Sequence, residues 1–326
     1  MNVRYVIYAL LMLLSFEMVA CSADDASAPA EERIPVAFTI GFSGMTRSTT
    51  IENAWTSGDA IAVANVEHTY RYTAAANSEA GGAANLTFVD YESQFFWPND
   101  DPHWSFTAWY PYQATPHTSV NLAADQRSTS ADTPADAGTL TADAYRQYDL
   151  LFCPAVSSTI RKRVHLLFYH QLAHLVVNAT VSTKSGTTTE QVTGILLGSE
   201  NVAVMGALTM GTTGTSVETP TVSWTVNTSD QTNTIKMRHT ATTGSLFKFE
   251  SMLPPQSIGD SDTPLLTVTT TDGTLTRTYI YKAPCTLRAG YEYTIALTIN
   301  ELGILKVETL QIASWNTGTN GTGIVR

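Results

Sequence analysis

The chain has few of the residue patterns on which catalytic and redox sites depend. It has three cysteines and no Cys-x-x-Cys pair, so nothing supports redox catalysis. It contains no Gly-x-Ser-x-Gly motif and no Gly-rich phosphate loop followed by Lys-Ser or Lys-Thr, and its Asp and Glu residues are scattered or lie in turns. We find no catalytic constellation, and we expect no enzymatic activity and no cofactor.

Charge is also scarce, at 14% of residues, with 18 basic and 29 acidic side chains giving a net charge of −11. No cluster of Lys and Arg is long enough to follow a phosphate backbone, so we expect no nucleic-acid partner. Thr and Ser stand where exposed helices would carry Glu and Lys, and no long amphipathic helix is evident. The composition therefore predicts an all-β protein, and 326 residues favour two domains.

The first 20 residues have the parts of a secretory signal. A short basic start is followed by the apolar run 6–16, which is too short to span a membrane. Cys21 directly follows Ala20, which resembles a bacterial lipoprotein signal whose Cys becomes the lipidated first residue, although Met18 stands in place of the usual Leu. An ordinary cleaved signal with an incidental Cys is the alternative.

Residues 21–33 then comprise the lipidated Cys21 and a polar, Pro-containing tether. Asp24 and Asp25 behind the Cys look like the signal that sends some lipoproteins to the outer face of the outer membrane. We therefore expect a lipid anchor in the outer membrane and a location at the cell surface or in a fimbrium.

The rest of the chain divides into two predicted β-sandwich domains, 34–160 and 161–326. In the first, Ile34, Val36, Phe38 and Ile40 alternate on one face of a leading strand. Residues 113–146 are mostly Ala, Thr, Ser and Asp, and predict a long loop. In the second, short strands separated by Gly, Asn and Thr turns recur at the spacing of a sandwich.

The stretch 164–181 is β-branched and aromatic, and its apolar residues change parity. They occupy even positions up to Phe168 and odd positions from Ala173 onward. Because successive side chains of a strand point to opposite faces, one straight strand cannot bury both sets. We expect two strand halves joined by a bulge or bend between His170 and Ala173.

The histidines and cysteines give weak signals. His170 and His174 share parity, but their Cα atoms would lie about 13 Å apart on an extended strand, too far for one metal ion. We expect no metal site, and histidines that are packed or hydrogen-bonded instead. Cys153 and Cys285 either form a disulfide or are isolated small core residues.

The aromatic residues fall into two groups. Trp104 and Phe106 share one parity and Trp109 has the other, as a strand buried on both faces requires. The run Phe95, Phe96 and Trp97 adjoins the turn sequence 98–102 and is the candidate for an exposed aromatic patch. Exposed aromatic faces would suit stacking against sugar rings.

Several segments together resemble the fimbrillin family, the subunits of type V pili and their accessory surface lipoproteins. The matching residues are Ala20-Cys21, Thr46-Arg47, Trp55-x-x-Gly58-Asp59-x-Ile61-x-Val63, Phe106-x-Ala108-x-Tyr110-Pro111-Tyr112, Phe168-x-His170-x-Leu172-Ala173-x-Leu175, Leu253-Pro254-Pro255-Gln256, Leu287-x-Ala289-Gly290-x-x-Tyr293 and Ile312-x-x-Trp315. They cover nearly the whole chain in this order. The doubled Pro at 254–255 and the Thr-rich insert around 211–219 depart from the pattern.

The resemblance implies two transthyretin-like (Ig-like) sandwich domains and a role as a pilus subunit or tip adhesin. It also implies assembly by strand exchange: a protease cuts at Arg47, the leading strand carrying Ile34, Val36, Phe38 and Ile40 is lost, and another subunit supplies a strand. The donor candidate is the C-terminal run with Ile304, Val307 and Leu310. Expected partners are other pilus subunits, and a host or bacterial surface glycan or protein as adhesion ligand. A stand-alone carbohydrate-binding lipoprotein that captures glycans is the alternative.

Overall fold

The computed structural model describes residues 33–42, 55–75, 83–98, 103–127, 145–159, 162–182, 190–210, 222–300, 305–314 and 320–323. The first seven strands along the chain are β1 (Phe38–Phe42), β2 (Ala60–Ala64), β3 (Thr69–Ala74), β4 (Ala84–Phe88), β5 (His103–Tyr110), β6 (Ser119–Asn121) and β7 (Leu151–Thr159). Then follow β8 (Val164–His170), β9 (Ala173–Val181), β10 (Gln191–Ala203), β11 (Met205–Met210), β12 (Val222–Thr225), the 3-10 turn η2 (Thr228–Asp230), β13 (Gln231–Lys236), β14 (Arg238–Thr243) and β15 (Leu246–Leu253). The last are β16 (Gln256–Ile258), β17 (Pro264–Thr271), β18 (Thr276–Lys282), β19 (Cys285–Leu287), β20 (Tyr291–Ile299), β21 (Leu305–Ser314) and β22 (Asn320–Gly323). The predicted all-β class is confirmed.

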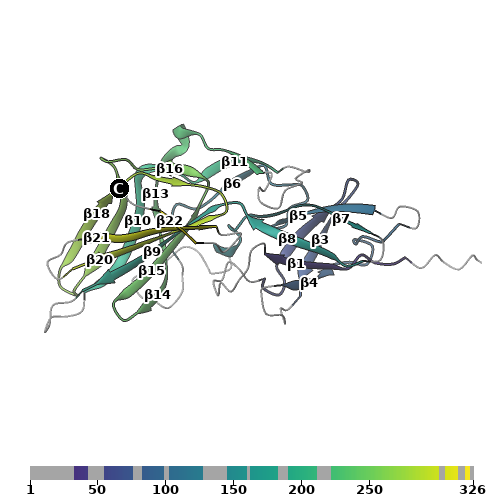
Figure 1. Cartoon of the computed structure of the whole chain (residues 1–326), viewed down its shortest axis with the longest axis horizontal. Coiled ribbons are helices and arrows are strands. Elements are labelled where there is room, and N and C mark those ends of the chain that lie inside the picture. The colour runs from purple at the N-terminus through teal and green to yellow at the C-terminus, as the bar shows by residue number, and fades with distance from the viewer. Residues whose placement is uncertain are drawn as a thin grey trace, which may run out of the picture. The chain divides into compact units, whose positions relative to one another are not determined.

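The strands nearer the N-terminus form a closed barrel in the order β1-β4-β3-β2-β5-β7-β8 (Figure 1). Strand β1 closes it, pairing antiparallel with β4 and parallel with β8. Alternate residues of each strand face inward, and many of these buried side chains are aromatic. Closure leaves β1 without an open edge.

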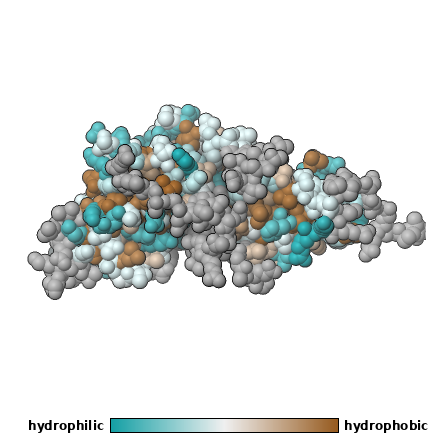
Figure 2. Space-filling view, viewed as in Figure 1, coloured by the Kyte–Doolittle hydropathy of each residue, from teal (hydrophilic) through white to brown (hydrophobic). Residues whose placement is uncertain are grey.

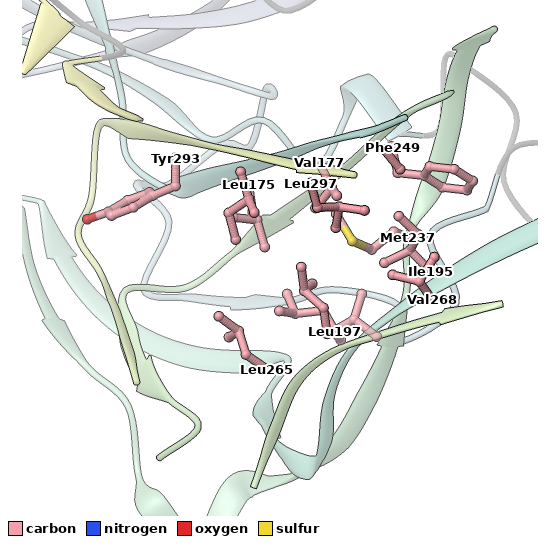
Figure 3. Packing of buried hydrophobic residues seen from close by; sticks show 14 of the residues in the cluster. Leu175, Val177, Ile195, Leu197, Met237, Phe249, Leu265, Val268, Tyr293 and Leu297 are labelled. Atoms are coloured by element: carbon pink, nitrogen blue, oxygen red, sulfur yellow. The ribbon is translucent and has the colours of Figure 1, made fainter. Parts of the chain in front are cut away.

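The strands nearer the C-terminus form a sandwich of two sheets with the orders β13-β10-β17-β18 and β14-β15-β9-β20-β21-β22. Leu175 and Val177 of β9 face Ile195 and Leu197 of β10 across one hydrophobic core (Figure 3). Phe249 lies in the same core and is 1% exposed. The alternation in each strand therefore places one face in this core and the other outside.

The predicted break between His170 and Ala173 is confirmed, since β8 ends and β9 begins there. Val164 and Phe168 are buried in the barrel, whereas Leu175 is buried in the sandwich core. Strand β8 pairs with β1 and β7, whereas β9 pairs with β15 and β20. The chain thus changes sheets at Gln171–Leu172, while a domain boundary at 160 stays a prediction.

Part of the predicted loop 113–146 is ordered against the sandwich. Strand β6 pairs with β11, and Asp125 forms a bridge with Lys236. The buried Gln126 side chain donates to the Met252 carbonyl oxygen at 2.9 Å and accepts from its N–H at 3.0 Å, as a strand residue would. The expectation of one long loop is wrong at residues 119–121, which form β6, and pairing also holds Asp125 and Gln126. Residues 128–144 lie outside the described residues.

Cys153, Cys285, His170 and His174 are all buried. Cys153 and Cys285 are both free and buried, so the disulfide alternative is wrong. Burial raises the pKa of the Cys153 thiol to about 12 and that of Cys285 to about 11. His170 and His174 are both hydrogen-bonded to carboxylates, as expected of packed histidines.

On the face shown in Figure 2, hydrophilic and hydrophobic residues are interspersed. Among the described residues, no helix has the length and apolar character that crossing a membrane would require. The same residues contain no group of three or more His, Cys, Asp or Glu side chains arranged to hold a metal ion.

Candidate functional site

The candidate site is the first strand, β1, and the two strands that hold it. Val36, just before the strand, and Phe38, Ile40 and Phe42 within it face the barrel interior, with exposed fractions of 5%, 2%, 0% and 7%. Ile34, the first residue of the predicted strand, is half-buried and precedes β1. The alternation read from the sequence therefore becomes a row of buried side chains.

Backbone pairing holds β1 on both sides. Its partners on β8 run in register from Phe38 opposite Val164 to Phe42 opposite Phe168. On the other side, Thr39 lies opposite Asn85 of β4. The Val36 N–H donates to the Phe95 carbonyl oxygen at 2.9 Å, which fixes the start of the segment. The predicted leading strand is thus an internal strand of the barrel.

Phe38 occupies an aromatic pocket. Its ring makes edge contacts with Phe106 at 5.0 Å and Tyr72 at 5.2 Å between centroids. The Tyr72 hydroxyl accepts a hydrogen bond from the Phe95 N–H at 2.9 Å, and burial raises its pKa above the ordinary value. Because rings surround this pocket and edge-to-face contacts add to burial, it suits a large apolar side chain at position 38.

The other end of β1 packs on a buried polar pair. The Phe42 ring stacks on Trp55 at 4.9 Å and on His170 at 5.5 Å. His170 Nδ1 lies 2.8 Å from Asp149 Oδ1, and both side chains are almost fully buried. Loss of Phe42 would uncover this pair, so β1 also shields a polar group from water.

The predicted exposed aromatic patch is wrong for two of its three residues. Phe95 and Trp97 are 2% and 6% exposed. Their rings contact Phe106 inside the barrel, at 5.2 Å and 6.4 Å between centroids. Only Phe96 is partly exposed. The turn residues next to Pro98 suggested a surface position, but Phe95 and Trp97 are large apolar side chains that pack in the hydrophobic core.

The C-terminal run is held less deeply. Strand β21 pairs antiparallel with β20 and with β22, so it completes a sheet of its own chain. Leu305, Val307, Leu310 and Ile312 are half-buried against the sandwich core. A register shift between Ala296 and Leu297 of β20 leaves Glu308 as an extra residue. This bulge carries the inward face from odd to even positions and explains the imperfect alternation.

Several predicted residues lie outside the described residues. These are Cys21, the lipidation candidate, Arg47, the cleavage candidate, and Ile304, the first residue of the donor candidate. The structure therefore brings together Val36, Phe38 and Ile40 in the barrel and, separately, Val307 and Leu310 on the sandwich.

Sequence reasoning missed a charged cluster on the sandwich. Arg238 donates to Glu250 at 2.6 Å, and His174 lies 3.7 Å from Glu250 and 3.1 Å from Glu292. Burial by itself would raise the pKa of both carboxyls. The His174 hydrogen bond and nearby positive charges outweigh this effect, so each pKa lies below its ordinary value. Spacing along the chain could not reveal this cluster, because its members come from four different strands.

Gln256, the last residue of the Leu253-Pro254-Pro255-Gln256 motif, binds the backbone of β10 through its side chain. The Gln256 side chain accepts from the Ala203 N–H at 2.8 Å and donates to the Ala203 carbonyl oxygen at 2.8 Å. It pairs with β10 as a backbone amide would. An amide side chain is needed there because it carries both a donor and an acceptor.

The comparisons with known proteins agree with this architecture. A family model described as fimbrillin-like matches residues 46–315. A crystal structure of a candidate cell adhesion protein from Bacteroides uniformis has a TM-score of 0.55 and 19% identity, covering 88% of this chain and 99% of the other. Another from Bacteroides ovatus has a TM-score of 0.56 and 15% identity, covering 87% and 98%. A comparison with curated proteins returned no match.

A barrel closed by its own first strand, followed by a β-sandwich, places the chain in the all-β class. The chain belongs to the fimbrillin-like family. Membership of this family indicates a pilus-type protein of the cell surface or fimbrium.

Proposed function

We propose that this protein is a surface-anchored pilus subunit or tip adhesin that assembles by strand exchange at β1. The observation that carries the proposal is the position of β1 as the closing strand, with pairing on both sides and alternate side chains in the core. Cleavage at Arg47 would separate this strand covalently from the rest of the barrel. Its release would leave a groove between β4 and β8.

The energetic cost of an empty groove favours exchange over simple loss. Burying one large apolar side chain stabilises a fold by about 1.5–3 kcal/mol. Val36, Phe38, Ile40 and Phe42 together therefore contribute roughly 6–12 kcal/mol, comparable with the whole stability of a typical domain. The backbone groups of β4 and β8 would also lose their partners. A barrel without β1 needs a replacement strand.

The groove defines what the replacement must be. An incoming strand would run parallel to β8 and antiparallel to β4, as β1 does. It would place one large apolar side chain in the Phe38 pocket and another against Trp55 and His170. Main-chain hydrogen bonds would give affinity, and the pockets would select the partner.

The donor candidate is the C-terminal run 304–312 of another subunit. Its apolar side chains are half-buried in their own sheet, whereas those of β1 are fully buried. Moving such a strand from the sandwich into a barrel would increase its burial. A subunit whose run stays on β20 would instead end the polymer, as expected of a terminal or tip position.

We propose Cys21 as the attachment point to the outer membrane, as a lipidated first residue. The support is the sequence: an apolar signal run, Ala20 before Cys21, and Asp24-Asp25 behind it. Cys21→Ala in cells should abolish partitioning into detergent and retention at the cell surface, measured by protease shaving of intact cells, and persistent anchoring would contradict lipidation there. Burial of Phe95 and Trp97 removes two of the three rings that the sequence offered to the glycan-capture alternative.

Controlled proteolysis tests the exchange. An Arg-specific protease should cut the purified wild type at Arg47, and the cut protein should form ladders that resist SDS. Arg47→Ala should stay intact, and a chain ending at residue 303 should be cut but should form no ladder. Wild type that is cut at Arg47 and forms no ladder would contradict the mechanism.

A synthetic peptide with the sequence of residues 34–42 provides a matched control. Added to the cut protein, it should occupy the groove and block ladder formation. The same peptide with Ala in place of Phe38 and Phe42 should block far less, because it cannot fill the two aromatic pockets. Equal blocking by both peptides would mean that the pockets do not select the donor.

A further inference from the structure

The two ends of the barrel differ in what they carry. Pairing directions place the starts of β1, β3, β5 and β8 at the same end as the ends of β2, β4 and β7. At the opposite end, β8 leads into β9 and the sandwich. The chain preceding Val36 therefore joins the barrel at the end remote from the β8–β9 connection. We call it the entry end.

Exposed apolar side chains gather at the entry end. Among the described residues, the barrel has four exposed large apolar side chains: Val66 at 96%, Phe88 at 45%, Val89 at 59% and Tyr91 at 51%. Val66 lies in the β2–β3 turn, and the other three lie at or after the end of β4. All four therefore belong to the same end. We call them the apolar rim.

The apolar rim is built rather than incidental. The Tyr91 ring makes edge contacts with Phe88 at 6.3 Å and with the half-exposed Phe96 at 5.3 Å. Phe96 sits between Phe95 and Trp97, which anchor this loop in the barrel core. The exposed rings are thus held in place by buried neighbours, so their display requires no rearrangement.

The charges around the rim are mixed. Lys162 and Arg163, just before β8, are exposed at this end, and so are Asp90 and Glu92. This balance does not suit a strongly anionic or cationic partner. Tyr and Phe with a polar border are typical of side chains that lie at the boundary between lipid headgroups and acyl chains.

We propose that, while the chain is uncut at Arg47, the apolar rim rests on the lipid surface of the membrane to which Cys21 anchors it. The inference rests on the proposed lipidation at Cys21. The chain joins the barrel at the entry end, and a segment from Cys21 to Pro35 reaches at most about 50 Å. The rim is therefore the part of the barrel nearest the point where the anchor leads in.

Anchoring makes a weak contact sufficient. A short polar linker holds the attached barrel near the membrane at an effective concentration in the millimolar range. A rim whose affinity for lipid is too low for binding from solution would still be occupied on an anchored chain. The contact would orient the barrel with β1 toward the membrane and leave the sandwich away from it.

The test uses a chain that starts at Cys21 and is coupled through that thiol to a maleimide phospholipid in phosphatidylcholine–phosphatidylethanolamine vesicles. Cys153 and Cys285 are buried and their pKa values are raised, so they compete poorly for the maleimide. Tyr91→Trp reports on the rim. Ile280→Trp is the matched control, because Ile280 is 55% exposed on β18 of the sandwich. Each is measured against the parent chain with lipids brominated near the headgroup.

Bromolipid should quench most of the emission added by Tyr91→Trp and little of that added by Ile280→Trp. Adding Val66→Ser and Val89→Ser to Tyr91→Trp should reduce the quenching several-fold. Equal quenching at positions 91 and 280 would overturn the proposal. So would emission at 91 that changes with protein density rather than with bromolipid, since that result indicates a second copy as the occupant. Coupling is chemical, so a failure of lipidation in cells is a separate result.

Discussion

Strands β1 and β21 lie near opposite ends of the described chain, and each pairs with a strand on both sides, yet they are held very differently. The inward side chains of β1 are at most 7% exposed, whereas those of β21 are half-buried. Strand β1 closes a barrel, and β21 lies next to the edge of a sheet. Removing β1 opens a ring of hydrogen bonds, but removing β21 and β22 merely makes β20 the new edge.

The difference separates two roles that a terminal strand can have. When a deeply buried strand is removed from a closed sheet, it leaves unpaired backbone groups and empty side-chain pockets that only a matching strand can fill. A half-buried strand beside an edge can leave at lower cost. Near its start the chain thus has a strand whose loss would open an acceptor groove. Near its end it has a strand that could be donated more easily.

Removing each strand in turn should give the largest difference between β1 and β21. A chain starting at Trp55 should lose the barrel, at a cost of roughly 6–12 kcal/mol. A chain ending at residue 303 should keep both cores. Hydrogen exchange followed by mass spectrometry should show unprotected β2, β5 and β7 only in the first truncation. A chain starting at Val36 is the control and should behave as the intact protein.

Single side chains give the next largest contrast. Phe38→Ala should cost about 3–5 kcal/mol, because it empties a pocket walled by rigid rings. Leu310→Ala should cost about 1 kcal/mol, because that side chain is only partly buried. Urea unfolding monitored by hydrogen exchange of β8 and β20 measures each cost in its own sheet. Similar costs for the two variants would show that β1 and β21 are equally held.

The bulge in β21 predicts a smaller effect. Deleting Glu308 would turn Leu305 and Val307 away from the core, and we expect a loss of about 1–2 kcal/mol. Glu308→Ala keeps the residue count and should have little effect. Thermal melts of both variants measure these stability losses. A deletion variant as stable as the parent would mean that the bulge does not set the register.

Acidification should give the smallest effect and should act on the sandwich. The pKa of Glu250 and of Glu292 is lowered in the folded state, so their charged forms stabilise it above the unfolded value of 4.5. That stability is lost as pH falls through the lower folded pKa values. Melting temperatures should therefore drop below about pH 4.5, and Glu250→Gln should flatten the drop. An unchanged pH profile in Glu250→Gln would remove this cluster as its cause.

Much of the fold could be read from the chain alone. The parity change between Phe168 and Leu175 predicted the break at Gln171–Leu172, and the alternation of Val36, Phe38 and Ile40 predicted a strand. Both signals are local, because strand periodicity is a property of neighbouring residues. The same locality explains the imperfect pattern of β21, which the bulge at Glu308 accounts for.

Only the tertiary structure decided which strands pair with which and what each core encloses. That β1 closes a barrel depends on Val164 and Asn85, both far along the chain. Burial of Phe95 depends on Tyr72 and Phe106, and the Arg238–Glu250–His174 cluster depends on strands that meet only in the folded sheet. Periodicity tells a residue's face but not its neighbour, and the neighbour decides whether that face meets a core, a partner strand or water.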